Sequence, residues 1–150
     1  MTVPLDPRGD AVLAAELLAL QRAAYAVEAA LIGDDRIPPL HEDLAALRAA
    51  ALRWTGVRAG RRLTGAVAWT DEGDRVDVHR LVVAPAAGRR GIGTALVRSV
   101  LAAAGARATV VATGRDNAPA RALYERLGFV PTGDREVLPG LWVTGYRHDP

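Results

Sequence analysis

The feature that most constrains the fold is a change in the spacing of apolar residues near Arg53. Over residues 13–31, apolar side chains recur every three or four positions, which predicts an amphipathic helix. Over residues 54–84 they alternate with polar side chains, which predicts β-strands. A glycine-rich turn after Pro85 then precedes another apolar stripe with helical spacing. The sequence therefore predicts an α/β (α+β) fold, and 150 residues suit a single domain, residues 1–150.

Two helices are expected before the first hairpin. The inward face of the first is expected to consist of Leu13, Leu17, Leu20, Ala24, Val27 and Leu31. Because proline has no backbone N–H, the pair Pro38-Pro39 is expected to keep the connection non-helical. The inward face of the second helix is expected to consist of Leu40, Leu44, Leu47 and Ala51. An antiparallel hairpin over residues 54–70 and a third strand over residues 75–84 follow.

Composition and charge argue against several classes of protein. The net charge is +2, and all 19 basic residues are arginines dispersed along the chain, so we expect no nucleic-acid partner. There is no cysteine, and His41, His79 and His148 lack metal-ligand spacing, so neither thiolate chemistry nor a metal is expected. No uncharged apolar run of about 18 residues and no leader pattern at the start is found, so we expect a cytoplasmic protein without a membrane partner.

The glycine-rich turn has the composition of a phosphate-binding loop. Before a helix expected over residues 94–104 stand three glycines: Gly88, Gly91 and Gly93. The first N–H groups of a helix attract anions, and Arg89 and Arg90 add charged donors. The absence of lysine excludes a Walker loop, and Leu96 excludes a dinucleotide fingerprint because that position needs a small residue. Alone, the turn equally suits a structural connection in any α/β domain.

A second strand-to-helix connection has clearer signals for where its helix begins and ends. After a strand expected over residues 109–113, Asn117 suits the N-cap of a helix over residues 118–127. Gly128 suits the left-handed end of the same helix. The boundaries of this helix are therefore well defined by the sequence.

Two segments carry a family resemblance. Residues 117–129 resemble the signature Asn-x-x-Ala-x-x-Leu-Tyr-Glu-x-x-Gly-Phe of the GNAT superfamily of N-acetyltransferases. Upstream, residues 79–85 and 91–96 resemble the acetyl-CoA motif of the same superfamily. On these two motifs together, the chain is identified as a member of that superfamily.

The resemblance implies both a fold and a cofactor. It implies a mixed, mostly antiparallel central sheet of six to seven strands flanked by about four helices. The implied order is strand-helix-helix-strand-strand-strand-helix-strand-helix-strand-strand. Acetyl-CoA is the implied cofactor, and the residues implied to bind it are Leu81, Val82, Val83, Arg89, Arg90, Gly91, Ile92, Gly93, Thr94, Ala95, Asn117, Ala120 and Tyr124. Gly88 departs from the family pattern, which usually has Arg or Gln there.

The implied reaction moves an acetyl group from acetyl-CoA to a primary amine by direct attack in a ternary complex. Tyr124 is the implied general acid, because a phenol can protonate a leaving thiolate. Asp77 and His79 are the candidate bases, and strand alternation predicts that both face the same side as Leu81 and Val83 unless a bulge intervenes. The structural alternatives are a core tyrosine and an ordinary strand surface.

Several alternatives remain open at the level of sequence. The domain could bind acetyl-CoA as a catalytically silent sensor or partner-binding module, or bind a nucleotide through the glycine turn. The acceptor could be a small molecule or a protein amine. Five acidic residues near residues 37–40 would form a rim that favours a cationic amine, or would cap helices: Glu28, Asp34, Asp35, Glu42 and Asp43. The resemblance also allows a homodimer through the last strands.

Overall fold

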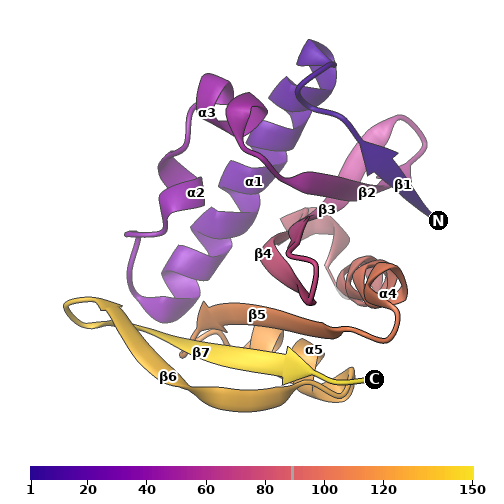
Figure 1. The fold of residues 1–150 in the computed structure, drawn as a ribbon. Helices are drawn as coiled ribbons and strands as arrows, with labels where there is room; N and C mark the ends of the chain where they lie inside the picture. The colour runs from indigo at the N-terminus through magenta and orange to yellow at the C-terminus, as the bar shows by residue number, and fades with distance from the viewer. Residues whose placement is uncertain (89) are drawn as a thin grey trace.

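The computed structural model describes residues 1–88 and 90–150. Its elements in chain order are β1 (Thr2–Leu5), α1 (Ala11–Ile32), α2 (Pro38–His41), α3 (Leu44–Ala49), β2 (Arg53–Ala59), β3 (Arg62–Asp71), β4 (Arg75–Val83), the short 3₁₀ turn η1 (Pro85–Ala87), α4 (Ile92–Ala104), β5 (Ala108–Gly114), α5 (Ala118–Arg126), β6 (Val130–Leu138) and β7 (Leu141–His148). The strands form one sheet in the order β1-β2-β3-β4-β5-β7-β6 (Figure 1). Among the described strands, β4 and β5 are the one parallel pair, which confirms the predicted mostly antiparallel sheet.

Helices α1 and α4 lie on opposite sides of this sheet (Figure 1), and an apolar core fills the space on each side. The first core packs α1 and α3 against β2, β3 and β4, and Leu17 and Leu47 are fully buried in it. The second core packs α4 and α5 against the sheet, and Leu96 and Val100 are fully buried in it. Burial of these side chains is the main stabilising contribution to the fold. Within residues 1–88 and 90–150, no helix has both the length and the apolar character needed to span a bilayer.

Helix α1 begins and ends where its sequence indicates, but its buried face differs from the predicted one. The Asp10 carboxylate accepts the backbone N–H of Leu13 over 3.0 Å, and Gly33 ends the helix with a φ of 68°. The predicted inward residues Val27 and Leu31 are 46% and 49% exposed. The inward face continues instead through polar and aromatic residues: Gln21, Tyr25 and Glu28. The prediction was wrong here because this half of the helix faces a cavity rather than an apolar core.

The predicted second helix is divided into α2 and α3. Pro38 and Pro39 occupy the first helical positions of α2, where a missing N–H costs nothing, so they begin a helix rather than prevent one. Glu42 then takes extended backbone angles, and the Asp43 carboxylate accepts the N–H of Ala46 over 2.8 Å to begin α3. Of the predicted inward residues of this segment, Leu47 is fully buried, but Leu44 is 37% exposed and Ala51 is exposed beyond the end of α3, so the prediction was wrong for these two.

A β-bulge changes the facing of β4. Ala68 pairs with Arg80 and Trp69 with Val78, so His79 is an extra residue in β4 with no partner on β3. Before the bulge Val78 packs in the α4-side core, and after it Leu81 packs against that same core. The expectation that Asp77, His79, Leu81 and Val83 share one face is therefore wrong: Asp77 faces the opposite side of the sheet from Leu81.

The centre of the sheet opens between β4 and β5. These strands pair from Arg75 opposite Ala108 to Val78 opposite Val111, and no further pairing is found among the described residues. Beyond that point β4 continues to Val83 and β5 to Gly114. The separation exposes the edges of both strands and places the candidate site at the middle of the molecule.

Candidate active site

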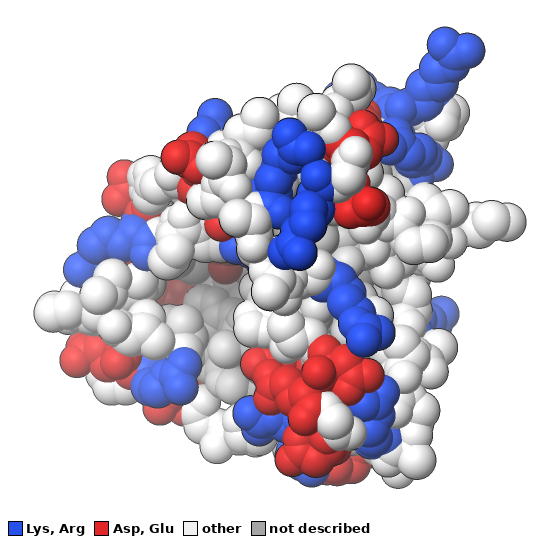
Figure 2. Space-filling model, turned by 45° about the horizontal axis from the view of Figure 1, so that its top comes forward, with Lys and Arg blue, Asp and Glu red and all other residues white. Residues whose placement is uncertain are grey.

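A cavity of about 440 Å³ occupies the opening between β4 and β5. Helix α1 and α2 cover it on one side, and the β6–β7 hairpin contributes Leu138 and Leu141 on another. Figure 2 shows one face of the molecule hollowed, with basic side chains in separate groups rather than one patch. We refer to this space as the central cavity. Five of the predicted site residues line it: His79, Leu81, Asn117, Ala120 and Tyr124.

Tyr124 is held rigidly at the base of the central cavity. Its side chain is 3% exposed, and its ring packs edge-on against Phe129 with a centroid distance of 5.4 Å. The ring of Tyr146 lies 5.9 Å away on another side. Burial, reinforced by the charge of Glu28, raises the pKa of the Tyr124 hydroxyl well above its ordinary value. The phenol is therefore a proton donor, not an anion, throughout the neutral pH range.

Glu28 connects α1 to α5 inside the central cavity. Its Oε1 accepts a hydrogen bond from Nδ2 of Asn117 over 3.0 Å, and the Asn117 Oδ1 accepts the N–H of Ala120 over 3.2 Å. Burial raises the pKa of the Glu28 carboxyl, while the bond from Asn117 opposes that rise. From the sequence, Glu28 was predicted only as one member of an acidic rim. Its position on the cavity side of α1 could have been predicted from the spacing of four and three residues, which puts Gln21, Tyr25 and Glu28 on one helix face.

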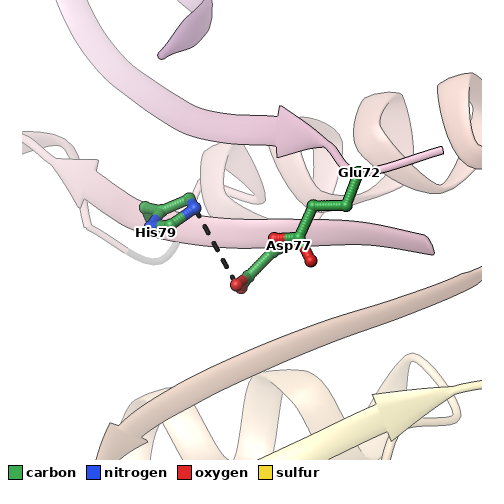
Figure 3. Close-up of side chains that lie close together, drawn as sticks. All are labelled: Glu72, Asp77 and His79. Carbon is green, nitrogen blue, oxygen red and sulfur yellow. Dashed lines mark ion pairs between the residues drawn. The ribbon is translucent and has the colours of Figure 1, made fainter. Parts of the chain in front are cut away.

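The two candidate bases lie together but occupy different positions relative to the cavity. His79 lines the central cavity and contacts Thr70 Oγ1 through Nε2 over 2.9 Å, whereas Asp77 is not part of the lining. Figure 3 shows the His79 ring directed toward the Asp77 carboxylate, which lies 3.8 Å from Nε2. Burial raises the pKa of Asp77, and the nearby Glu72 carboxylate adds to the rise, while His79 opposes it. The ligand atoms of Glu72, Asp77 and His79 lie within 4.8 Å of one another, so the expected lack of a metal stays a prediction.

The glycine turn has the geometry of an anion site. Gly91 is the N-cap of α4 with a φ of 73°, a left-handed conformation that glycine adopts most readily. The first N–H groups of α4 have no partner within the helix, because the first helical bond runs from Ala95 to Gly91. A Cβ on Gly93 would lie 3.3 Å from Leu123 Cδ2 and 3.9 Å from Val83 Cγ2. The predicted contact Arg89 lies outside the described residues.

The sequence profile of the acetyltransferase (GNAT) family matches residues 16–129. The chain belongs to the GNAT acetyltransferase family. The Escherichia coli ribosomal-protein-S18-alanine N-acetyltransferase has a similar structure, with a TM-score of 0.77 and 14% identity over 99% of this chain and 92% of that one. A GNAT acetyltransferase from Elizabethkingia anophelis with acetyl-CoA bound has a TM-score of 0.61 and 15% identity over 67% of this chain and 77% of that one. These two likenesses concern the fold.

A curated relative is similar in sequence. UPF0157 protein YqkA of Bacillus subtilis (strain 168) is 33% identical over 139 residues, which cover 92% of this chain and 40% of that protein. The chain therefore spans about 40% of the length of the relative it matches. GNAT membership supports an acyltransferase whose donor is acetyl-CoA, and the identity of the acceptor is a separate matter.

The residues at the GNAT donor position fit acetyl-CoA. The left-handed Gly91 and the first N–H groups of α4 suit an anionic pyrophosphate. Gly93 lacks a Cβ beside Val83 and Leu123, so the turn approaches both β4 and α5 closely. Val82 is fully buried in the α1-side core, so any contact with the donor must come from its backbone. Gly88 has ordinary angles, with φ −59° and ψ 154°, and needs no glycine.

The predicted acidic rim is largely neutralised. Two oxygens of Glu42 accept from the Arg80 guanidinium over 2.6 and 2.9 Å, and Asp34 forms an ion pair of 2.7 Å with Arg36. The hydrogen bonds from Arg36 lower the pKa of Asp34 to about 2. Asp43 caps α3. The capping and ion-pair interpretation is therefore the better one for these three acids.

Proposed function

We propose that residues 1–150 form one N-acetyltransferase domain, which transfers the acetyl group of acetyl-CoA to a primary amine in a ternary complex. The observation that carries the proposal is the position of Tyr124. Tyr124 lines the central cavity and lies in α5, the helix whose sequence matches the family signature. Its hydroxyl is buried and has a raised pKa. An acid that stays protonated at neutral pH in a cavity beside the anion-binding turn is what release of a thiolate requires.

The donor would be held by three elements. The N–H groups of α4 and the side chain of Arg90 would bind the pyrophosphate, with Arg89 as a further predicted contact. The backbone of β4 near Leu81 and Val83 would bind the pantetheine, and Ala120 on α5 would face its end. When bound, acetyl-CoA supplies an acetyl thioester whose carbonyl carbon is attacked by the amine.

The proton transfers would be divided between two sides of the central cavity. His79 is the better placed of the two predicted bases, because it lines the cavity and Asp77 does not. Its ring nitrogen would take a proton from the amine, while Asp77 at 3.8 Å would orient the ring and stabilise the imidazolium. Tyr124 would donate its phenolic proton to the leaving sulfur. Each proton transfer of this kind typically contributes about 10²- to 10⁴-fold to a rate.

The acceptor is a primary amine of a small molecule or of a protein. The structurally similar Escherichia coli enzyme is named for alanine of ribosomal protein S18, so a protein amine is one candidate. The central cavity, which is lined mainly by apolar side chains, suits a small amine as well. A cytoplasmic location and a homodimer remain predictions.

A panel of primary amines and amine-bearing peptides, with release of CoA thiol and the mass of the product as readouts, tests the proposal. We expect turnover of at least one amine, with a product 42 Da heavier than the acceptor, which is about the mass of one added acetyl group. Binding of acetyl-CoA without thiol release for any acceptor would instead indicate a catalytically silent sensor. ATP that competes equally with CoA would indicate a generic nucleotide site.

A further inference from the structure

Besides its two tyrosines, four ionisable side chains line the central cavity, and the charges of two are balanced within the protein: Glu28, Arg36, His79 and Arg80. Arg80 is bound by both oxygens of Glu42, and Arg36 is paired with Asp34. Within residues 1–88 and 90–150, no cation lies within ion-pair distance of Glu28. When ionised, this carboxylate is therefore a negative charge in the cavity with no cationic partner among the described residues.

The position of Glu28 is fixed by its neighbours. Asn117 Nδ2 donates to Oε1, and the backbone N–H of Gly114 also donates to the carboxylate. On the side of β5, a Cβ on Gly114 would lie 3.6 Å from Oε1 and 3.1 Å from Ile32 Cγ2. A Cβ there would make an ordinary contact with the carboxylate and a tight one with Ile32, so the strand lies close to both side chains. The carboxylate is thus held in place from α5 and β5, with acceptor capacity to spare.

Much of the rest of the cavity wall is apolar. The cavity is also lined by aliphatic and proline side chains from α1, the α1–α2 connection, α2 and the β6–β7 hairpin: Ile32, Ile37, Pro38, Leu138 and Leu141. A partly buried carboxylate beside apolar side chains is costly unless a cation accompanies it. A ligand that matches both the carboxylate of Glu28 and the apolar part of the wall has one positive charge on an apolar body.

We infer that Glu28 binds the ammonium group of the acceptor, and that the acceptor class is a monoamine with an apolar body. The inference rests on the proposed function for the identity of the site. A second positive charge on the acceptor would have no second carboxylate to meet, because Glu28 is the one acidic side chain among the described residues that line the cavity. Diamines and aminoglycoside-like polycations are therefore disfavoured relative to a monoamine of equal size.

The test compares the wild-type protein with E28Q, E28D and D35N. D35N is the matched control, because Asp35 is exposed, lies near the same helix end and does not line the cavity. The probes are 2-phenylethylamine, the uncharged 2-phenylethanol and the dication 1,5-diaminopentane. Binding is measured by calorimetry with CoA present, and turnover by thiol release. Acetyl-CoA affinity, measured separately, reports on integrity of the donor site.

For E28Q we expect binding of 2-phenylethylamine to weaken by about 10- to 100-fold, the usual effect of losing one charge-assisted contact. The same loss should appear in kcat/KM, because the ammonium nitrogen of a monoamine is also the nucleophile, and E28D should recover part of it. D35N should match the wild type, and the wild type should bind the amine more tightly than either of the other two probes.

The outcomes separate this inference from the proposed function. If 2-phenylethylamine binds through Glu28 but no amine is acetylated, the binding site stands and the enzymatic proposal fails. If amines are acetylated and E28Q behaves like D35N, Glu28 is not the ammonium site. Wild-type protein that binds 2-phenylethanol as tightly as the amine, or binds no amine, also overturns the inference, and this comparison needs no variant.

Discussion

Asn117 donates its side-chain amide to Glu28 over 3.0 Å and thereby joins α5 to α1 across 89 residues of sequence. The same side chain caps α5 by accepting the N–H of Ala120. One asparagine consequently fixes the start of the helix that carries Tyr124 and the orientation of the carboxylate opposite it. Both sides of the central cavity depend on this residue.

Substitution of Asn117 separates its two contributions. Asn117→Ala removes the cap and the partner of Glu28, and we expect a loss of about 1 kcal/mol or more in the free energy of unfolding. Asn117→Asp keeps a good N-cap but places a second carboxylate against Glu28. We expect that variant to be destabilised at pH 7 and to recover as the pH is lowered, because protonation of either carboxyl removes the repulsion. Urea denaturation at pH 5 and pH 7 checks this, and equal losses for both variants at both pH values would contradict it.

The raised pKa of Glu28 predicts the pH dependence of stability. Because the folded state holds this proton more tightly than the unfolded state, with its ordinary value of 4.5, stability falls as pH rises from 4.5 through the raised value. E28Q cannot ionise, so we expect it to lack that decline and to be at least as stable as wild type at pH 7. Thermal melting of wild type, E28Q and D35N between pH 4 and pH 8 measures the effect. A steeper decline in E28Q than in wild type would show that the carboxylate is stabilised by folding.

Much of the fold follows from sequence because local signals act over short ranges. The hairpin of β2 and β3 and the caps of α5 depend on strand alternation and on Asn117 and Gly128, which operate within a few residues. The family signature adds the order of elements and the sheet. These features were predictable, and the structure confirms them.

The structure differs from the sequence predictions where contacts between residues far apart in the sequence determine the conformation. The bulge at His79 depends on the pairing of β4 with β3, which no pattern within β4 reveals. The exposure of Val27 and Leu31 depends on what lies opposite the end of α1, a cavity rather than an apolar core. The predicted position of Glu28 near residues 37–40 agrees with the structure, but its bond to Asn117 could not be predicted because that partner is 89 residues away.

The two tyrosines of the central cavity offer a matched comparison. Tyr25 and Tyr124 are 8% and 3% exposed, both line the cavity, and burial raises the pKa of both hydroxyls. Tyr124→Phe keeps the ring contacts with Phe129 but removes the acid, so we expect kcat to fall by about 10²-fold or more with acetyl-CoA affinity unchanged. Tyr25→Phe should leave kcat within about threefold. Steady-state thiol release measures both, and a similar kcat for the two variants would remove Tyr124 from the acid role.

The glycine turn contains a position that requires glycine and one that does not. Gly91 has a φ of 73°, so Gly91→Ala should cost about 1 kcal/mol of stability and weaken acetyl-CoA binding by displacing the first N–H groups of α4. Gly88 has a φ of −59°, and an added Cβ would lie 3.5 Å from the Pro85 carbonyl oxygen, an ordinary contact. Gly88→Ala is therefore the control and should be nearly neutral. Thermal melts and CoA titration distinguish the two, and a large loss at Gly88 would show that the turn changes conformation on binding.

The ion pair between Arg80 and Glu42 fixes α2 over the central cavity. Their side chains are 13% and 15% exposed, and the fully buried Gln21 accepts from Arg80 over 3.1 Å and donates to the carbonyl of Pro39 over 2.8 Å. Removing Arg80 leaves the Glu42 carboxylate with the hydrogen bond from Gln21 Nε2 over 3.2 Å but without its cation, so we expect Arg80→Met to cost about 3 kcal/mol. Glu42→Gln, which keeps an acceptor, should cost less.

The double variant decides whether the pair acts as a unit. Met keeps an apolar side chain beside Trp54 and removes the positive charge that pairs with Glu42. Glu42→Gln should therefore cost little stability once Arg80→Met is present. We expect a coupling energy of about 1–3 kcal/mol from urea denaturation of the four proteins in the cycle. Strict additivity would mean that the two side chains contribute independently, and α2 would then be held over the cavity chiefly by the hydrogen bond from Gln21 to Pro39 and by apolar contacts of Leu40.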